Sequence, residues 1–324
     1  MTHFRTLGMA GAAALLLAVP AHAQRQVNER HDASATGTVE VHMNSGSVRV
    51  TGWSRNEVQV TGSLSRTGDR VMMEGAGRTL EVRVASRNGG RGGAAALEIR
   101  VPAGSTLEVT AGSAPITVSG VTGSVEAVSG SGPVTVQGSS RRVEVVAQSG
   151  PVTIDGQTDV LDVTAMSGPV RVNASVRQRA AIEALSGPVD VLGAVGELQL
   201  NAMSGPVRVT NATGRVEIEA VSGNVVVNGT RLRGSVQSVS GGVVVGGTLG
   251  GALDLESHGG DVELRLPQGA SAEVEVATFS GRLQSEFGGG ARQSGGRQRH
   301  VTIGRGGPAV TIKTFSGNVK LLRR

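Results

Sequence analysis

The stretch SGPVRV at residues 167–172 recurs letter for letter at 204–209. Close variants stand at 131 (SGPVTV), 149 (SGPVTI), 186 (SGPVDV), 222 (SGNVVV) and 240 (SGGVVV). From Ser113 onward, the serines that begin these motifs follow one another at steps of 18, 18, 18, 19, 18, 18 and 18 residues. Such a fixed period indicates a repeat architecture, in which every unit must bend at the same place.

Residues on both sides of each motif alternate between apolar and polar. Counted from this corner serine, positions −6, −4, −2, +3 and +5 are apolar or small, whereas −5 and +4 are mostly polar or charged. One repeat supplies Val143, Val145, Ala147, Val152 and Ile154 to the apolar set. A period of two with β-branched residues predicts two short strands per repeat, each with one buried face.

The corner itself has residues suited to a bend. Glycine adopts positive φ without a Cβ clash, and the proline that often follows it suits the first residue of a strand. One strand pair cannot bury its apolar face alone, but stacked units form a continuous interior. The sequence therefore predicts an all-β fold, a single-stranded parallel β-solenoid (β-helix) with rungs of about 18 residues, right-handed by the usual crossover preference. Propeller blades have longer periods, and sandwich strands lack such identity.

The chain divides into segments of different character. Residues 1–23 read as a signal peptide, with an apolar run from Met9 to Pro20 and cleavage after Ala23. Residues 24–35 are polar and are expected to be flexible, and the β-solenoid is expected over 36–322. Its expected parts are irregular first rungs at 36–110, regular repeats at 111–283, a Gly/Arg-rich loop at 284–300 and last rungs at 301–322. Ser280 and Ser316 are 36 residues apart, which suggests two periods.

The signal segment predicts export to the periplasm, the outer membrane or the extracellular space. Its apolar run is too short for a transmembrane helix, and no later segment is long and apolar enough. The chain has no cysteine, which excludes disulfides, thiolate chemistry and a lipid-modified cysteine. Its net charge of +5 favours loose attraction to anionic polysaccharide or lipopolysaccharide in the envelope.

No catalytic, cofactor-binding or metal-binding residue is predicted, and no cofactor. The sequence lacks a G-x-S-x-G elbow, an H-E-x-x-H helix, a P-loop and a dinucleotide-binding turn. After residue 23 the histidines are His31, His42, His258 and His300, too scattered to indicate a metal cluster or a Ser-His pair. The corner serines are explained by turn chemistry. Nucleic acid is not an expected partner, because stacking on bases needs more aromatic residues.

Stacked repeats turn sequence columns into rows on the surface. The −5 column reads Glu126, Glu144, Asp162, Ala181, Gln199, Glu217, Ser235. Adjacent carboxylates repel one another, and either a calcium ion or nearby arginines would relieve the repulsion. We favour an acidic stripe balanced by Arg141 and Arg142, because a carboxylate row rarely completes a calcium shell. The +4 column reads Thr135, Thr153, Arg171, Asp190, Arg208, and its alternating signs stabilise the register modestly.

Aromatic residues are scarce. After the signal segment they are Trp53, Phe279, Phe287 and Phe315. Two of them, Phe279 and Phe315, directly precede a Ser-Gly corner, and we expect them to form a buried cap. Polysaccharide-active enzymes also use parallel β-helices, but their sites usually combine aromatic platforms with clustered acidic or basic groups.

Several segments together resemble a known family. They are the S-G-x-V-x-V unit, VPAGSTLEVT at 101–110, LPQGASAEVEVATFSG at 266–281 and the final TFSGNVKL. They are similar to a bacterial family of β-strand-repeat proteins, a domain of unknown function whose members are commonly labelled putative adhesins and are often exported. The resemblance implies a solenoid in the cell envelope and supplies no catalytic residues.

The sequence thus predicts a non-enzymatic, exported β-repeat protein of the cell envelope that acts as an adhesin or a structural scaffold. Two alternatives stay open. One is a polysaccharide-active β-helix enzyme, and the other is a filament that self-associates through its terminal rungs, since unpaired strand edges template further strands.

Overall fold

The computed structural model describes residues 25–76, 78–87, 90, 92–287, 292–294 and 298–324. The predicted signal peptide and parts of the Gly/Arg-rich stretch lie outside these residues. The described chain consists of strands and turns, so the expected all-β class is confirmed. None of its segments is a helix long and apolar enough to span a membrane.

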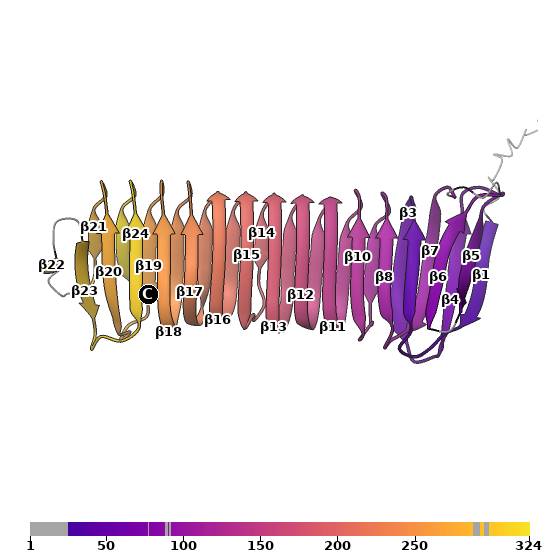
Figure 1. Ribbon diagram of the computed structural model, residues 1–324, viewed down its shortest axis with the longest axis horizontal. Helices are drawn as coiled ribbons and strands as arrows, with labels where there is room; N and C mark the ends of the chain where they lie inside the picture. The colour runs from indigo at the N-terminus through magenta and orange to yellow at the C-terminus, as the bar shows by residue number, and fades with distance from the viewer. Residues whose placement is uncertain (1–24, 77, 88–89, 91, 288–291, 295–297) are drawn as a thin grey trace, which may run out of the picture.

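The strands stack into a rod in which each level contributes one strand to each of two faces (Figure 1). Face A holds the strands that lead into the corner serine, and face B holds the strands that follow it. Long strands run from face B of one level through the return bend to face A of the next. The described residues give thirteen parallel levels on each face, so the parallel part of the rod is about 58 Å long at about 4.8 Å per level.

Along face A, the successive levels are β6 (Thr79–Ala85), β2 (Thr38–Met43), β8 (Thr106–Ala111), β10 (Ser124–Ser129), the second parts of β11 (Val134–Ser149), β12 (Val152–Ser167) and β13 (Val170–Ser186), β15 (Glu197–Ser204), the second parts of β16 (Val207–Ser222), β17 (Val225–Ser238) and β18 (Val243–Ser257), β24 (Ala309–Thr314) and β20 (Ala272–Thr278). Along face B, they are β7 (Ala95–Pro102), β3 (Gly46–Trp53), β9 (Ile116–Ser119), the first parts of β11, β12 and β13, β14 (Val189–Val191), the first parts of β16, β17 and β18, β19 (Val262–Leu266), β25 (Val319–Arg323) and β21 (Leu283–Ser285).

The 18-residue period sets the register between levels. Val152 pairs with Val170 and Val170 with Val189, so repeated valines lie directly over one another. The single step of 19 residues is absorbed in the return bend of β13, where the register with β12 shifts by one residue. Because the extra residue lies in a bend, the side-chain alternation of both faces stays intact. The same extra residue within a strand would turn the apolar side chains that follow it outward.

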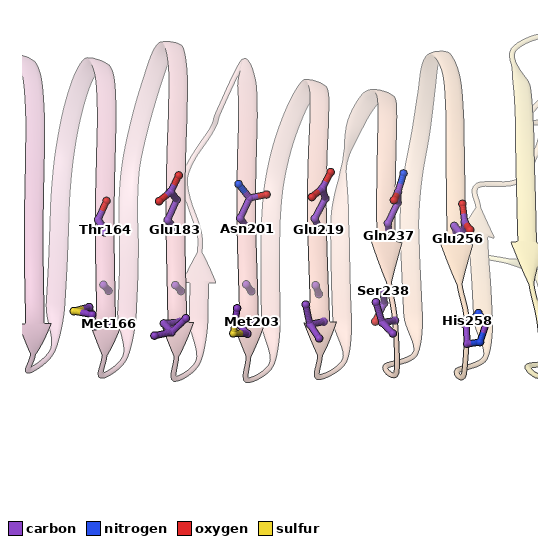
Figure 2. Close-up of a pocket in the computed structure, with 17 residues that line it drawn as sticks. Thr164, Met166, Glu183, Asn201, Met203, Glu219, Gln237, Ser238, Glu256 and His258 are labelled. Carbon is purple, nitrogen blue, oxygen red and sulfur yellow. The ribbon is translucent and has the colours of Figure 1, made fainter.

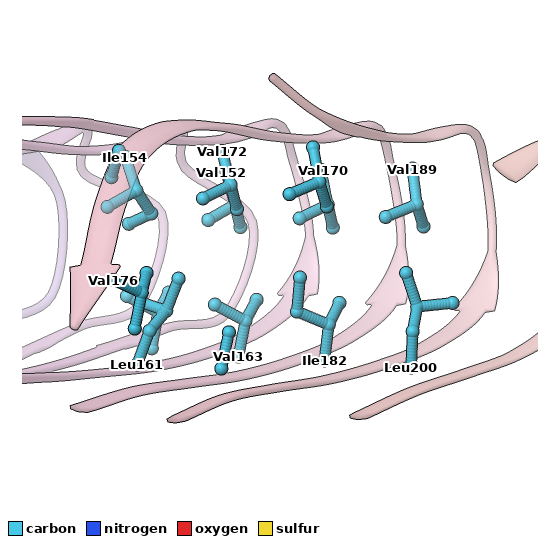
Figure 3. Close-up of a cluster of buried hydrophobic side chains, with 14 of the residues drawn as sticks. Val152, Ile154, Leu161, Val163, Val170, Val172, Val176, Ile182, Val189 and Leu200 are labelled. Atoms are coloured by element: carbon cyan, nitrogen blue, oxygen red, sulfur yellow. The ribbon is translucent and has the colours of Figure 1, made fainter. Parts of the chain in front are cut away.

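The core is the space between the two faces. Val152 and Ile154 of face B pack opposite Leu161 and Val163 of face A, and all four are at most 2% exposed (Figure 3). The same arrangement repeats along the stack and forms one continuous apolar cluster. Burial of each Val, Leu or Ile side chain contributes about 1.5–3 kcal/mol, so short strands that are individually unstable hold together.

The N-terminal end is closed by antiparallel strands. β1 (Arg25–Asp32) runs antiparallel to β4 (Glu57–Leu64), and β4 runs antiparallel to β7. On the other face β5 (Arg70–Ala76) runs antiparallel to β6. The expectation that residues 24–35 are flexible is therefore wrong for β1. Its side chains are mostly polar and exposed, but its backbone pairs along its whole length with β4, and Val27 packs inward.

Chain order and spatial order differ at both ends. The level made by β2 and β3 lies between the levels of β6–β7 and β8–β9. Likewise, β24 and β25 lie between the level of β18–β19 and that of β20–β21. The final rung in sequence is thus the penultimate level in space, which corrects the expectation that 301–322 ends the stack.

The Gly/Arg-rich stretch does not form two further periods. Ser280 and Ser316 belong to adjacent levels, because Phe279 and Ser280 bond to backbone carbonyls of residues 314 and 315. The intervening chain includes β23 (Gln298–Ile303), which lies antiparallel to β20, and β22 (Arg292–Ser294), which pairs with β23. The described part of the expected loop is therefore partly a strand pair that covers the end of face A.

Candidate functional site

The corners fix the position of every outward row beside them, and they have two chemical forms. In the first form, glycine has φ near +120° and alanine stands at −2; its glycines are Gly150, Gly168, Gly187, Gly205 and Gly223. In the second form, a buried or half-buried Ser or Thr hydroxyl at −2 accepts a hydrogen bond from the glycine N–H. Its hydroxyl residues are Ser129, Ser238, Ser257, Thr278 and Thr314. Sequence reasoning missed the two forms, although the signal is present: −2 is Ala in five successive repeats and Ser or Thr in the repeats that follow.

From Met166 toward the C-terminal end of the stack, face A carries an exposed apolar residue at −1, directly before the corner, on all levels but one. We call this row the apolar ladder. Its members are Met166, Leu185, Met203, Val221, Val239, Phe315 and Phe279, between 45% and 54% exposed. His258 occupies the level between Val239 and Phe315. Because strand residues alternate in direction, −1 points outward whenever −2 points into the core.

This ladder is unusual for a protein surface. Single exposed apolar residues are common, whereas a contiguous row on successive levels exceeds the scatter expected of a monomer surface and indicates an interaction site. The repeated Ala-x-Ser-Gly context of the ladder signals it in the sequence, since a fixed outward position filled by Met, Leu and Val departs from polar-out alternation.

The expected burial of Phe279 and Phe315 is wrong. They are 52% and 50% exposed, and their rings stack on each other with centroids 4.8 Å apart and an interplanar angle of 6°. The ring of His258 stacks on the other side of Phe315, at 4.9 Å and 6°. The spacing of the levels explains this, because about 4.8 Å between strands also suits stacked rings. The three rings therefore extend the ladder rather than cap the core.

A groove of about 810 Å³ runs along face A between the ladder and the row at −3 (Figure 2). We call the row at −3 the polar wall. Its members are Thr164, Glu183, Asn201, Glu219, Gln237 and Glu256. Between the two rows, the strand backbone at −2 forms the floor of the groove, where Ala184 and Ala202 turn their side chains into the core. Past His258 a second hollow of about 340 Å³ continues beside the stacked phenylalanines, where Lys313 takes the place of the wall's carboxylates.

The wall's carboxylates have no ion-pair partner among the described residues. Glu183, Glu219 and Glu256 are exposed, and each is separated from the next by one level that carries an amide, Asn201 or Gln237. At about 4.8 Å per level, the three carboxylates therefore repeat at about 9.6 Å. One wall of the groove is thus anionic and hydrogen-bonding, and the other is apolar.

The −5 column stacks as expected and begins earlier than predicted. Glu126 pairs with Glu144 and Glu144 with Asp162 across adjacent levels. Toward the N-terminal end the row continues through Glu108, Glu40 and Glu81. This extension was hidden in the sequence because the first levels stack out of chain order.

Arginines balance parts of this acidic row, as predicted for Arg142. Its guanidinium lies 3.2 Å from Glu144 and 2.6 Å from Asp162, and Arg215 pairs with Glu217. Toward the N-terminal end Arg83 lies 3.4 Å from Glu81, whereas at Glu108 burial and then the charges of the neighbouring carboxylates raise the pKa of that carboxyl. The +4 column also stacks as predicted, and Arg171 lies 3.8 Å from Asp190.

The histidines lie far apart, as the sequence indicated. His300 Nε2 lies 2.6 Å from Glu273 Oε2, His42 lies 3.9 Å from Glu40, and His31 bonds locally. Within the described ranges, no three His, Cys, Asp or Glu side chains are grouped so that they could hold a metal ion. Of the two hollows along the ladder on face A, the groove is the larger.

Comparison with solved structures gives remote similarities. One is a "putative adhesin" from Parabacteroides distasonis, with 12% identity, TM-score 0.45, and coverage of 90% of this chain and 98% of that one. Another is a "putative adhesin" from Parabacteroides merdae, with 12% identity, TM-score 0.40 and coverage of 92% and 96%. A "putative lipid binding protein" from Parabacteroides distasonis has 12% identity, TM-score 0.37 and the same coverage. At this level of similarity the names describe those proteins alone.

No curated protein matches the chain. A family model does match, over residues 37–322, which is nearly all of the sequence that follows the predicted signal and polar segments. This range contains every level of the stack and the whole groove, and the match confirms the family resemblance based on the repeated motif. The chain therefore belongs to the Toastrack DUF4097 family.

Proposed function

We propose that this protein is an exported, non-enzymatic binding rod of the cell envelope, an adhesin or a scaffold that holds its partner on face A. The observation that carries the proposal is the apolar ladder beside the polar wall. A repeated surface binds along its length, and each level adds a similar small contribution, as in other solenoid proteins. Export by residues 1–23 and the right-handed winding belong to this proposal.

The groove favours binding over polysaccharide cleavage. Glycoside hydrolysis needs two carboxyl groups that flank the scissile bond. In the groove, Glu183, Glu219 and Glu256 lie in one row on the same wall, and the opposite wall is apolar. That geometry suits contact along a ligand rather than attack from both sides of a bond.

The ends of the rod disfavour the filament alternative. Antiparallel strands cover both faces at the N-terminal end and face A at the C-terminal end. The remaining edge, on face B, is β21, a parallel strand of three residues that offers little backbone for pairing with a further rung. β1 also carries several charged side chains at the edge, a feature that limits edge-to-edge pairing. Light scattering against protein concentration tests this, and we expect a constant mass for a monomeric rod.

The function is tested with cell envelopes from the bacterium that encodes the protein. Fractionation with surface proteolysis locates the protein, and the purified protein is then tested for envelope binding. We expect Leu185→Ser combined with Met203→Ser to weaken binding at least tenfold. The matched control is Leu192→Ser combined with Val226→Ser, which removes apolar groups outside the groove. Binding that survives the ladder variant, or release of sugar fragments from the envelopes, refutes the proposal.

A further inference from the structure

We propose that the groove binds a basic, proline-rich peptide segment that lies along the rod axis as a polyproline II helix. This inference rests on the proposed function and names the chemistry of its partner. It is drawn from three features of the described residues: unpaired carboxylates, their spacing and the apolar row beside them.

Charge complementarity identifies the ligand as a cation with an apolar side. Elsewhere on face A, Arg142 and Arg215 neutralise the carboxylates of the −5 row. The wall's three carboxylates, Glu183, Glu219 and Glu256, have no such arginine within the described part of the chain. The row of residues beside them is apolar and offers them no hydrogen-bond donor. An anionic lipid or polysaccharide would meet like charge here.

The spacing of the carboxylates selects the ligand's conformation. A polyproline II helix rises about 3.1 Å per residue with three residues per turn, so every third side chain lies on the same side at about 9.3 Å. The carboxylates repeat at about 9.6 Å. Basic residues at i, i+3 and i+6 therefore stay opposite all three, with an accumulated mismatch of about 0.6 Å.

Other peptide conformations fit less well. In an extended strand, the side chains on one side repeat at about 6.6–6.8 Å, which places the second and third basic groups about 3–4 Å from the middle carboxylate along the axis. An α-helix is about 10–12 Å wide with its side chains. Its side chains return to the same face after seven residues, about 10.5 Å along the axis, so a mismatch of about 1.8 Å accumulates over the three carboxylates.

The other two ridges of the polyproline II helix match the apolar ladder. When every third residue is basic, the remaining positions can hold proline, whose rings contact Leu185, Met203 and Val221 on the opposite wall. Lys313 ends the anionic part of the wall beyond Glu256 and limits the peptide to about seven residues. A preformed helix also loses less conformational entropy on binding than a flexible peptide.

The experiment measures fluorescence anisotropy with two labelled nonapeptides of equal composition and charge. The first, Pro-Pro-Arg repeated three times, places arginine at every third residue, and the second places the three arginines together between proline triplets. We expect the periodic peptide to bind at least fivefold more tightly at low salt. Weaker binding at high salt is also expected for both.

Matched variants separate the wall from general charge. Glu183→Gln, Glu219→Gln and Glu256→Gln together are expected to weaken periodic-peptide binding about tenfold, from three exposed charge pairs. The control, Glu40→Gln, Glu108→Gln and Glu126→Gln, removes the same charge from the acidic row and is expected to leave affinity within twofold. Circular dichroism verifies that both variants fold.

Three outcomes overturn the proposal: equal affinity for the two peptides, equal loss in both triple variants, or ladder-dependent binding to anionic phospholipid vesicles without binding of the periodic peptide. If the peptide fails while the Leu185→Ser and Met203→Ser variant still loses envelope binding, the partner's chemistry is wrong and the binding function stands. If that variant keeps its envelope binding, the proposed function itself fails.

Discussion

Replacement of one corner glycine should show how much of the stability depends on the stacked corners. Gly187 has φ of +117°, and a Cβ placed there lies 2.4 Å from the carbonyl oxygen of Gly168 on the adjacent level. Positive φ costs an alanine about 1–2 kcal/mol. The backbone contact adds about 1–3 kcal/mol, the usual cost of overpacking, because the rigid neighbouring corner must move. Gly187→Ala should therefore destabilise the rod by about 2–5 kcal/mol.

A second glycine separates the two contributions. Gly269 also has positive φ, +80°, but its Cβ would meet nothing within 4 Å, so Gly269→Ala should cost only about 1–2 kcal/mol. Denaturant unfolding followed by circular dichroism compares the two variants, and amide hydrogen exchange locates the change. We expect Gly187→Ala to lower protection mainly in β13, β14 and β15, because each level contacts chiefly its neighbours. Equal destabilisation by both substitutions, or loss of protection remote from the altered corner, contradicts the reasoning.

Three further predictions follow from the corners, the core and the acidic row. Ser257→Ala removes the acceptor of the Gly260 N–H and should cost about 1–3 kcal/mol in denaturant titration, whereas Ser186→Ala, at an exposed corner position, should stay within about 0.5 kcal/mol. Leu200→Ala opens a cavity between the faces and should cost about 2–5 kcal/mol; an unchanged denaturation midpoint would exclude tight packing there. Because burial and neighbouring carboxylates raise the pKa of Glu108, the folded state binds that proton more tightly, and the associated stabilisation is lost as pH rises through the folded pKa. Glu108→Gln should thus raise the Tm at about pH 7 and raise it less at about pH 3; a gain that does not depend on pH would show that the carboxylate's charge is not the cause.

The regular part of the stack could be predicted from the sequence because local and long-range signals agree there. The alternation at −6, −4 and −2 places Val143, Val145 and Ala147 inward, and the 18-residue period places the next repeat directly beside them. Since one register satisfies both signals, the pairing of β11 with β12 needs no further information. The same period also predicts which residues stack in the acidic row and in the +4 column.

The groove was overlooked for a physical reason. The alternation rule assigns −1 to solvent, where residues are usually polar, and only the −5 and +4 columns carry charges that form a visible pattern. For Phe279 and Phe315, the general tendency of aromatic residues to be buried predicts the opposite direction from the strand's own alternation. The phase of the strand decides the direction of a side chain more strongly than its hydrophobicity does, because reversing it would expose the inward residues on both sides.

The spatial order of the terminal levels cannot be predicted from the repeat period. β2 with β3 and β24 with β25 each occupy the place of a regular rung, yet their neighbours in space are separated from them by excursions of chain. Loop-closure entropy rises slowly with loop length, so a detour costs little compared with the apolar burial on both sides of an inserted level. An end level contacts the stack on one side only, and the antiparallel strands β1 and β23 follow as covers. In the sequence, this arrangement of the ends is visible only as a loss of the repeat, because antiparallel pairing imposes no 18-residue spacing.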